Sequence, residues 1–257
     1  MSPQRLFVLF AALGLLVYFG LSTQSPEIRR ANELRNKGLE VTGVENLLAD
    51  ATGLLTPVQK AELDALNKVL SASADDLLKA SALKELSGFW FRLGHHALAG
   101  SYARDVAELE TSADSWRIAG MTFLYGLEGD AAEQQKLFCR QMAANCFEQA
   151  LSLDPEEPAY AFYRAMAWVK FPEEDTPMKG IQMLLELEKE NPDYMPVQLQ
   201  LAELGIQTGQ MEKAEARLQK ILSQDSLQAQ ANCLMASLLE QTGRTGEMEK
   251  YIKHCKR

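Results

Sequence analysis

The sequence predicts an all-α protein whose C-terminal half is a row of repeated helix pairs. Its long stretches are rich in Ala, Leu, Glu, Gln, Lys and Met, which favour helices, and no run of alternating β-branched residues is typical of a strand. The triplet Gln207-Thr-Gly209 returns 34 residues later as Gln241-Thr-Gly243, and an amphipathic, Lys/Glu-rich run follows each copy. With 257 residues, 47% of them hydrophobic, the chain can bury a sizeable core.

The N-terminal region, residues 1–23, is predicted to be a membrane anchor or a signal segment. Residues 6–21 read LFVLFAALGLLVYFGL, which is sixteen residues without a charge. As a helix that rises about 1.5 Å per residue, this run would be about 24 Å long, slightly short of the ~30 Å hydrocarbon core of a bilayer. The best small-x-small cleavage site, at residues 20–22, is poor, and this favours an uncleaved anchor.

Two helical segments are expected between the anchor and the repeats. Residues 24–54 are predicted to form a charged stalk, and residues 55–112 to form helices that cap the N-terminal end of the repeats. The stretch Thr56-Pro57-Val-Gln59 has the features of a helix start, with Thr as N-cap, Pro at the first helical position and Gln in the capping-box position. The large apolar residues that follow are too numerous for a mobile linker.

Residues 113–257 are predicted to form four helix pairs, with Gly209 and Gly243 in the turns of the last two. After each glycine, three side chains of the second helix occupy matching offsets: Ala214, Leu218 and Ile221 in one copy, and Met248, Ile252 and Cys255 in the other. Such a shared register is hard to obtain by chance. It indicates a repeated helix–turn–helix unit.

An upstream unit carries further landmarks, at Trp116, Gly120 and Phe123, then at Ala143 and Phe147, and at Pro155. The whole pattern resembles the tetratricopeptide repeat, which has a 34-residue period. The resemblance implies a right-handed α-solenoid. The two halves of this first unit lie eleven residues too far apart, so an insertion around residues 130–141 is expected to lengthen its second helix by three turns. Residues 90–94 give a partial match that resembles the first helix of an abbreviated unit.

No pattern in the sequence is typical of an enzyme, a metal site or a cofactor site. His95 and His96 are adjacent, so on a helix they point about 100° apart and cannot share one metal ion. The net charge of −9 argues against a nucleic-acid partner, which would need clustered Lys and Arg. No small-molecule substrate is expected.

The four cysteines do not decide whether the protein lies in an oxidising or a reducing compartment. Cys139 and Cys146 are seven positions apart on one expected helix, about 10 Å along its axis, which is too far for a disulfide. Cys233 and Cys255 lie in the last helix pair and could be neighbours. Buried thiols are the more common state for such residues, and they are the expectation here.

The resemblance implies a concave groove, lined by the first helix of each repeat, that binds an extended or helical segment of a partner. Carried over residue by residue, the groove would contain Arg117, Met121, Leu124, Tyr125, Phe162, Met166, Val169, Lys170, Leu199, Glu203, Ile206 and Gln207, and in the last unit Cys233, Ser237, Glu240 and Gln241. Met and aromatic side chains suit an apolar or amphipathic segment. A carboxylate clamp for a partner's C-terminus is not expected, because Met121 and Phe162 occupy positions where such a clamp would need polar groups. The alternative is that helices of the chain itself fill the groove as ordinary core.

The expected function is a scaffold that binds a protein or peptide partner without catalysis. Two alternatives stay open: an assembly factor that presents unfolded clients, as in cytochrome maturation, and an accessory subunit of a membrane complex. The arrangement of anchor, capping helices and repeats resembles uncharacterised membrane-anchored tetratricopeptide-repeat proteins of Bacteroidota. This implies a single-pass protein of the bacterial inner membrane. Its soluble part is expected in the periplasm, although the basic residues after the anchor favour the cytoplasm.

Overall fold

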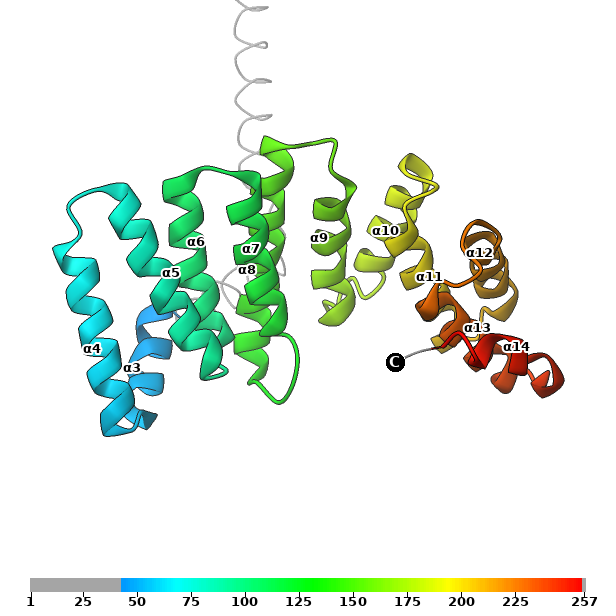
Figure 1. Cartoon of the computed structure of the whole chain (residues 1–257), viewed down its shortest axis with the longest axis horizontal. Coiled ribbons are helices and arrows are strands. Elements are labelled where there is room, and N and C mark those ends of the chain that lie inside the picture. The colour runs from blue at the N-terminus through cyan, green and yellow to red at the C-terminus, as the bar shows by residue number, and fades with distance from the viewer. Residues whose placement is uncertain (1–42, 256–257) are drawn as a thin grey trace, which may run out of the picture.

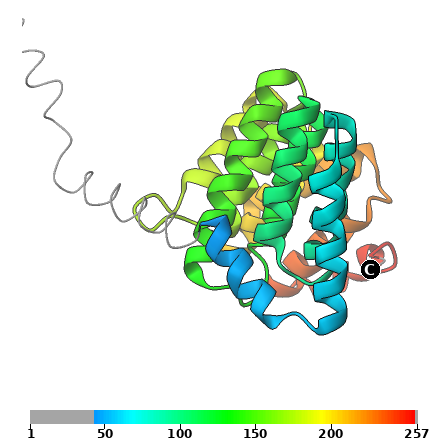
Figure 2. The same ribbon diagram turned by 90° about the vertical axis from the view of Figure 1, so that its left-hand side faces the viewer.

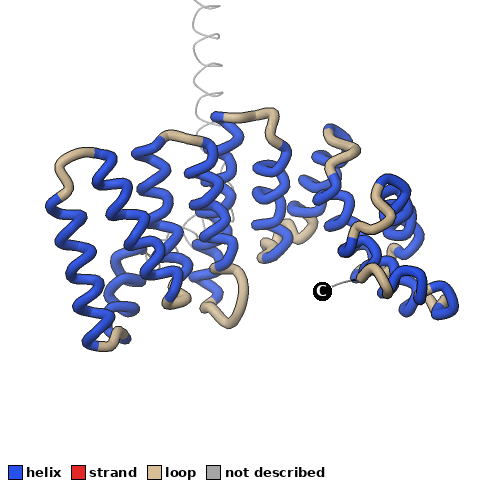
Figure 3. Tube along the Cα trace, in the orientation of Figure 1, coloured by secondary structure: helices blue, strands red, loops and turns tan. Residues whose placement is uncertain are grey.

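The computed structural model describes residues 43–255. This part of the chain contains twelve α-helices, one short 3-10 helix and no β-strand, which confirms the all-α prediction (Figure 1, Figure 3). The expected membrane segment, residues 6–21, lies outside the described residues. Between residues 43 and 255, no helix is both long and apolar enough to span a bilayer.

The helices stand side by side in the order of the sequence, from α4 at one end to α14 at the other (Figure 1). Figure 2, which views the row from its α4 end, shows α3 and α4 nearest to the viewer. Most helices pack mainly against their neighbours along the chain, as expected of a solenoid, whereas α3 packs mainly against α6. The helices are α3 (Val44–Leu54), α4 (Pro57–Ala72), α5 (Asp76–Arg92), α6 (His96–Glu110), α7 (Ala113–Tyr125), α8 (Glu133–Leu153), α9 (Pro158–Lys170), α10 (Lys179–Glu190), α11 (Met195–Gln207), α12 (Met211–Gln224), α13 (Ala229–Gln241), the 3-10 helix η1 (Thr245–Glu247) and α14 (Glu249–Ile252).

Three turns between paired helices share one backbone conformation. Gly94, Gly209 and Gly243 have φ values of +79°, +75° and +74°. In each turn the glycine amide donates to the carbonyl three residues earlier, and the next amide donates to the carbonyl five residues earlier, at 2.7–3.2 Å. Glycine is favoured there because L side chains are strained at positive φ. The Gln-Thr-Gly repeat therefore marks helix turns, as predicted, and the turn at Gly94 extends the repeated geometry back to α5 and α6.

The N-terminal part of the row contains a repeat-like helix pair at the partial match of residues 90–94. The predicted capping region, residues 55–112, includes α5 and α6 as a helix pair joined by the repeat's own turn. α4 starts where predicted, with a capping box in which Gln59 donates its amide to the Thr56 hydroxyl (3.3 Å) and accepts from the Thr56 amide (2.8 Å).

α3 differs from the charged stalk predicted over residues 24–54, of which residues 24–42 lie outside the described part. Val44, Leu47 and Ala51 recur at helical spacing and form an apolar stripe. Ala51, 3% exposed, belongs to the core that α4, α5 and α6 share, and it lies there with Leu63. The sequence within residues 44–54 thus forms part of the N-terminal cap.

The eleven-residue insertion is divided between a helix and a turn. α8 has 21 residues and α12 has 14. The turn before α8 covers residues 126–132, whereas the turn before α12 covers only 208–210. The second helix is therefore longer by about two turns rather than the three predicted. Seven residues rotate a helix by almost two full turns, so the apolar face of α8 keeps its direction.

Arg140, in the added part of α8, supports the neighbouring loop of residues 171–178. Its guanidinium lies 4.4 Å from the Trp168 ring centroid and donates to the Phe171 carbonyl (3.2 Å). It also pairs with Glu173 at 3.4 Å, while its side chain is only 3% exposed. A buried charge needs such partners to offset its desolvation. The insertion therefore holds the proline-rich loop of the next pair in place.

Neighbouring helices come closest at small residues. A β-carbon at Gly120 would lie 2.7 Å from the Phe147 ring, and one at Gly100 would lie 2.6 Å from the Phe123 ring. Both rings are fully buried. At Gly180 a β-carbon would be 2.6 Å from the backbone nitrogen of Val169. Because glycine has no side chain, a large side chain or the backbone of a neighbouring helix can contact these positions directly.

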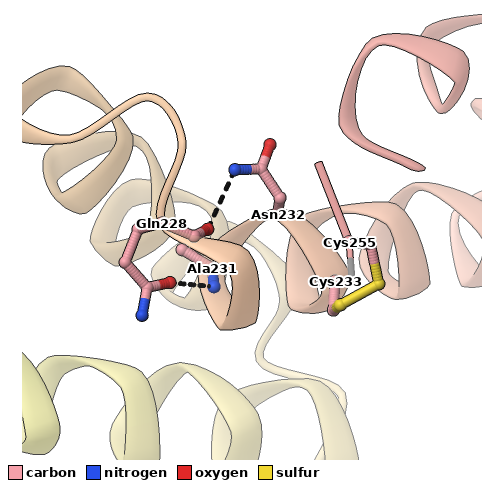
Figure 4. Close-up of a disulfide and its surroundings, with 5 residues drawn as sticks. All are labelled: Gln228, Ala231, Asn232, Cys233 and Cys255. Atoms are coloured by element: carbon pink, nitrogen blue, oxygen red, sulfur yellow. Dashed lines mark hydrogen bonds between the residues drawn. A yellow bond between two sulfur atoms is a disulfide. The ribbon is translucent and has the colours of Figure 1, made fainter. Parts of the chain in front are cut away.

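The C-terminal end of the row is closed by a disulfide between Cys233 on α13 and Cys255 after α14 (Figure 4). This corrects the expectation that both residues are buried thiols. From Thr242 to Cys255 no side chain is fully buried, so apolar packing alone holds this segment weakly. The disulfide therefore stabilises this segment, which lacks the packing that a full-length second helix would provide. Cys139 and Cys146 are free and buried, as expected for two residues too far apart to bridge.

Gly209→Ala is expected to destabilise the solenoid through backbone strain. No atom lies within 4 Å of the added methyl group, so steric overlap is not the cause. The left-handed conformation costs an L residue about 1–2 kcal/mol. Thermal unfolding followed by circular dichroism should show a lower Tm. Gly246→Ala is the matched control, because it adds a methyl group in open space without a positive φ. Equal melting of the two variants would contradict the role of the turn.

Reduction of the disulfide is expected to release the terminal segment. Closure of a loop of 22 residues stabilises a fold by about 3 kcal/mol in the chain-entropy account. Amide hydrogen exchange over residues 245–255 should therefore accelerate in dithiothreitol, while exchange in α5–α8 stays unchanged. A variant with Cys233→Ser and Cys255→Ser should exchange like the reduced protein and should not respond to reductant. A response in that variant would mean that reduction acts elsewhere.

Candidate protein-binding groove

The first helices of successive pairs are α5, α7, α9, α11 and α13, and contacts between α7 and α9 and between α11 and α13 place them on one side of the row. We call this side the first-helix face. Six of the residues predicted for the groove meet there around a single pocket of about 260 Å³, named here the α7–α9 pocket. These six are Met121, Leu124, Tyr125, Phe162, Met166 and Lys170. Glu128, Tyr163 and Gln200 complete its lining.

Aromatic rings in contact form one wall of the α7–α9 pocket. The Phe162 ring lies 5.3 Å from the Tyr163 ring and 6.1 Å from the Tyr194 ring, both in edge-on contact. Tyr163 also stacks on the buried Phe147 at 5.6 Å. Such contacts fix ring orientations, since aromatic pairs prefer offset or edge-on geometry at these distances. The wall is therefore preformed by packing that continues into the core.

The charged groups at the rim of this pocket neutralise each other. Lys170 Nζ lies 2.8 Å from Glu128 Oε1, so the ion pair bridges α9 and the turn after α7. The remaining lining residues are apolar, aromatic or amide side chains. An exposed pair of this kind contributes little to stability, about 0–1 kcal/mol. It leaves the pocket without a free charge.

Several other predicted groove residues do not line the pocket. Leu199 and Ile206, each 6% exposed, belong to the core between α11, α12 and α13. They correct the prediction, because an apolar residue on a first helix can face the next helix pair instead of the groove. Val169 packs beside Gly180 at the start of α10. Arg117 forms an ion pair with Asp114 at 2.6 Å.

The polar residues predicted on α11 and α13 lie apart from the α7–α9 pocket. Glu203 accepts a hydrogen bond from Gln200 at 3.4 Å, and Gln207 is exposed at the end of α11. In the last pair, Cys233 is in the disulfide, Gln241 donates to the Ser237 hydroxyl at 3.3 Å, and Glu240 is exposed. The structure does not bring these residues into a pocket with the apolar group.

A larger pocket, of about 550 Å³, lies between α5 and α7 over α6 and was missed from the sequence. We call it the α5–α7 pocket. Its lining residues are Lys84, Ser87, Gly88, Phe91, Arg92, Ala103, Val106, Glu110, Asp114, Ser115, Ile118 and Thr122. The partial repeat match at residues 90–94 could have predicted this pocket, because a first helix at that position extends the groove towards the N-terminus.

The two pockets are adjacent. Phe91, which lines the α5–α7 pocket, meets Tyr125, which lines the α7–α9 pocket, with ring centroids 5.3 Å apart. His96 packs against both rings, at 4.8 Å from Phe91 and 5.9 Å from Tyr125. Phe91 is 37% exposed and Tyr125 is 44% exposed. Both rings are therefore available to a partner, and the two pockets meet at this pair of rings.

The perturbed titratable groups near this face owe their shifts mainly to burial. Burial lowers the pKa of His96 below 6.5, although the Glu128 carboxylate partly opposes this and His95 adds to it. Burial also lowers the pKa of His95 and raises the pKa of Tyr194 to about 12. Among the described residues, no group of three or more His, Cys, Asp or Glu side chains could hold a metal ion.

Comparison with known proteins identifies tetratricopeptide repeats in the C-terminal part of the chain. Family models for this repeat match residues 179–238 and 229–257. These segments cover α10 to α14, and the turn at Gly94 shows related geometry well upstream of them. No curated protein matches the chain.

Solved structures with a similar arrangement of helices share little sequence with the chain. A crystal structure of MamA protein is 15% identical, with a TM-score of 0.45, and the match covers 68% of this chain and 89% of MamA. A second MamA structure is 16% identical with a TM-score of 0.45, covering 66% and 92%. A structure of IFIT1 with m7Gppp-AAAA is 12% identical with a TM-score of 0.39, covering 82% and 53%.

Acidification is expected to destabilise the junction around His96. Because its pKa is lower in the folded than in the unfolded chain, the folded state binds fewer protons below pH 6.5. Stability therefore falls as the pH drops through 6.5 towards the lowered pKa of His96 in the folded state. His96→Phe keeps a ring against Phe91 and Tyr125 but removes the titration. The drop in Tm over this pH range should be smaller in the variant, and an equal drop would exclude His96 as the cause.

Proposed function

We propose that this protein is a scaffold that holds a segment of a partner protein on its first-helix face. The observation that carries the proposal is the pair of adjacent pockets joined by the contact between the exposed rings of Phe91 and Tyr125. Exposed apolar side chains gathered on one surface are typical of protein-binding sites. The tetratricopeptide repeats within residues 179–257 support the same role.

The partner segment is apolar or amphipathic, and it is held by shape more than by charge. Met121 and Met166 offer adaptable side chains, while Tyr125 and Phe162 offer rigid rings. The rim charges of the α7–α9 pocket already neutralise each other. A net charge of −9 also disfavours a nucleic-acid ligand, whose phosphates would be repelled.

The protein carries out this role at a membrane, with residues 6–21 as its anchor. The Cys233–Cys255 disulfide supports placing the described domain in an oxidising compartment, because disulfides persist in the bacterial periplasm and are rare in the cytosol. This favours the periplasmic side over the cytoplasmic side. The basic residues after the anchor argue the other way, and the disulfide is the stronger observation because it concerns the folded domain itself.

Tyr125→Asp tests the proposal. Tyr125 is 44% exposed, so a carboxylate there should leave the fold intact while placing a charge between the two pockets. Loss of a central aromatic anchor typically weakens binding by about 2 kcal/mol or more. In cells treated with a crosslinker, the tagged variant should lose the partner proteins that the wild type recovers, as measured by quantitative mass spectrometry.

Leu185→Asp is the matched control. Leu185 is 38% exposed on α10, a second helix, and it lies outside both pockets. This variant should recover the same partners as the wild type. If Tyr125→Asp recovers them as well, the partner binds elsewhere on the protein, and the first-helix face is not the functional surface.

A further inference from the structure

The α5–α7 pocket contains a glycine that the packing of the chain does not require. At Gly100, Gly120 and Gly180 an added β-carbon would approach other atoms within 2.6–2.7 Å, so glycine is needed there. At Gly88 the nearest atom would be the Arg92 guanidinium, at 3.7 Å, which is an ordinary contact. Glycine in the middle of a helix such as α5 is less stable than alanine. The chain therefore carries a destabilising residue on the wall of a pocket.

A missing β-carbon deepens the pocket and lets another molecule approach the backbone of α5. The floor beside Gly88 is apolar, with Ala103 and Val106 from α6. Ile118, 48% exposed, and Phe91, 37% exposed, stand at its mouth. A ligand seated over Gly88 would cover both of these apolar side chains. Close backbone approach is a recurring reason for glycine in a helix or loop.

The charged residues of the pocket are already paired within the protein. Lys84 Nζ lies 2.5 Å from Glu110 Oε1, and Arg92 lies 2.8 Å from Glu62 on α4. Asp114 pairs with Arg117, and Glu110 also accepts a hydrogen bond from Ser115. Each charged residue of the wall thus already has a partner of opposite charge, and the wall presents no unpaired charge to a ligand. The pocket is therefore complementary to a neutral, apolar side chain.

We infer that the α5–α7 pocket is a second anchor site, which receives one uncharged apolar side chain of a partner segment whose backbone passes close to Gly88. The inference rests on the proposed function, because the same segment would reach the α7–α9 pocket across Phe91 and Tyr125. The occupant is a polypeptide with two apolar anchors, one for each pocket. A volume of about 550 Å³ admits a side chain as large as Leu, Met or Phe with room for the adjoining backbone.

Selection of peptides on the protein tests this. The immobilised full chain is panned with a displayed library of random twelve-residue peptides, and the affinity of the enriched peptides is measured for the wild type and for the variants Gly88→Leu, Lys79→Leu and Tyr125→Asp. Gly88→Leu fills the pocket from its wall, and it should weaken binding by about tenfold or more. Lys79→Leu adds a leucine on the opposite side of α5, nine residues away, and should leave affinity unchanged. Gly88→Ala should raise the Tm, which would show that the glycine is not needed for folding.

The outcomes separate the two proposals. Enriched peptides should carry two apolar positions, and replacement of one of them by alanine should remove the effect of Gly88→Leu. If peptides lose affinity for Tyr125→Asp but bind Gly88→Leu like the wild type, the second anchor site is wrong and the proposed function stands. If no peptide is enriched, both proposals fail. Enrichment of charged residues at the position sensitive to Gly88→Leu would overturn the neutral anchor.

Discussion

The close contact between neighbouring helices at glycine and alanine positions is the interaction on which the rest of this structure depends. At Gly100 and Gly120 the next helix places a phenylalanine ring where a β-carbon would stand. Most contacts join helices that are adjacent or next but one along the chain, so the helices form an open row without a single central core. The two pockets lie on the first-helix face of this row, one between α5 and α7 and one between α7 and α9. An interaction surface is thus a direct consequence of how the helices pack.

A row of this kind needs a covering at each end, because the terminal helices have no further neighbour. The chain uses different chemistry at its two ends. At the N-terminal end, α3 and α4 bury apolar side chains against α5 and α6, with Ala51 and Leu63 in the shared core. At the C-terminal end a four-residue helix, α14, offers no buried side chain, and a covalent bond between Cys233 and Cys255 holds it in place.

Much of the fold could be predicted from the sequence, because short sequence patterns specify the repeat. The glycines at 209 and 243, the alanine landmarks and the capping box at Thr56 each specify structure within a few residues. The site was harder to predict. Six residues of one pocket followed from the register of the repeat, whereas Leu199 and Ile206 have the same register and are core. Which side of a first helix is covered depends on the angle to the next pair, and no local pattern encodes that angle.

The cysteines show how tertiary structure decides what composition leaves open. Burial raises the pKa of Cys139 and of Cys146 to about 12, so neither thiol supplies the thiolate that disulfide exchange requires. Both side chains are at most 1% exposed, and an oxidant therefore reaches them only when the pair α7–α8 opens. Cys233 and Cys255 are less buried and close a loop of 22 residues at the end of the chain. Cys233 and Cys255 are thus the two cysteines that the fold brings together at an accessible position. The terminal cap can therefore oxidise without disturbing the helices that carry the two pockets.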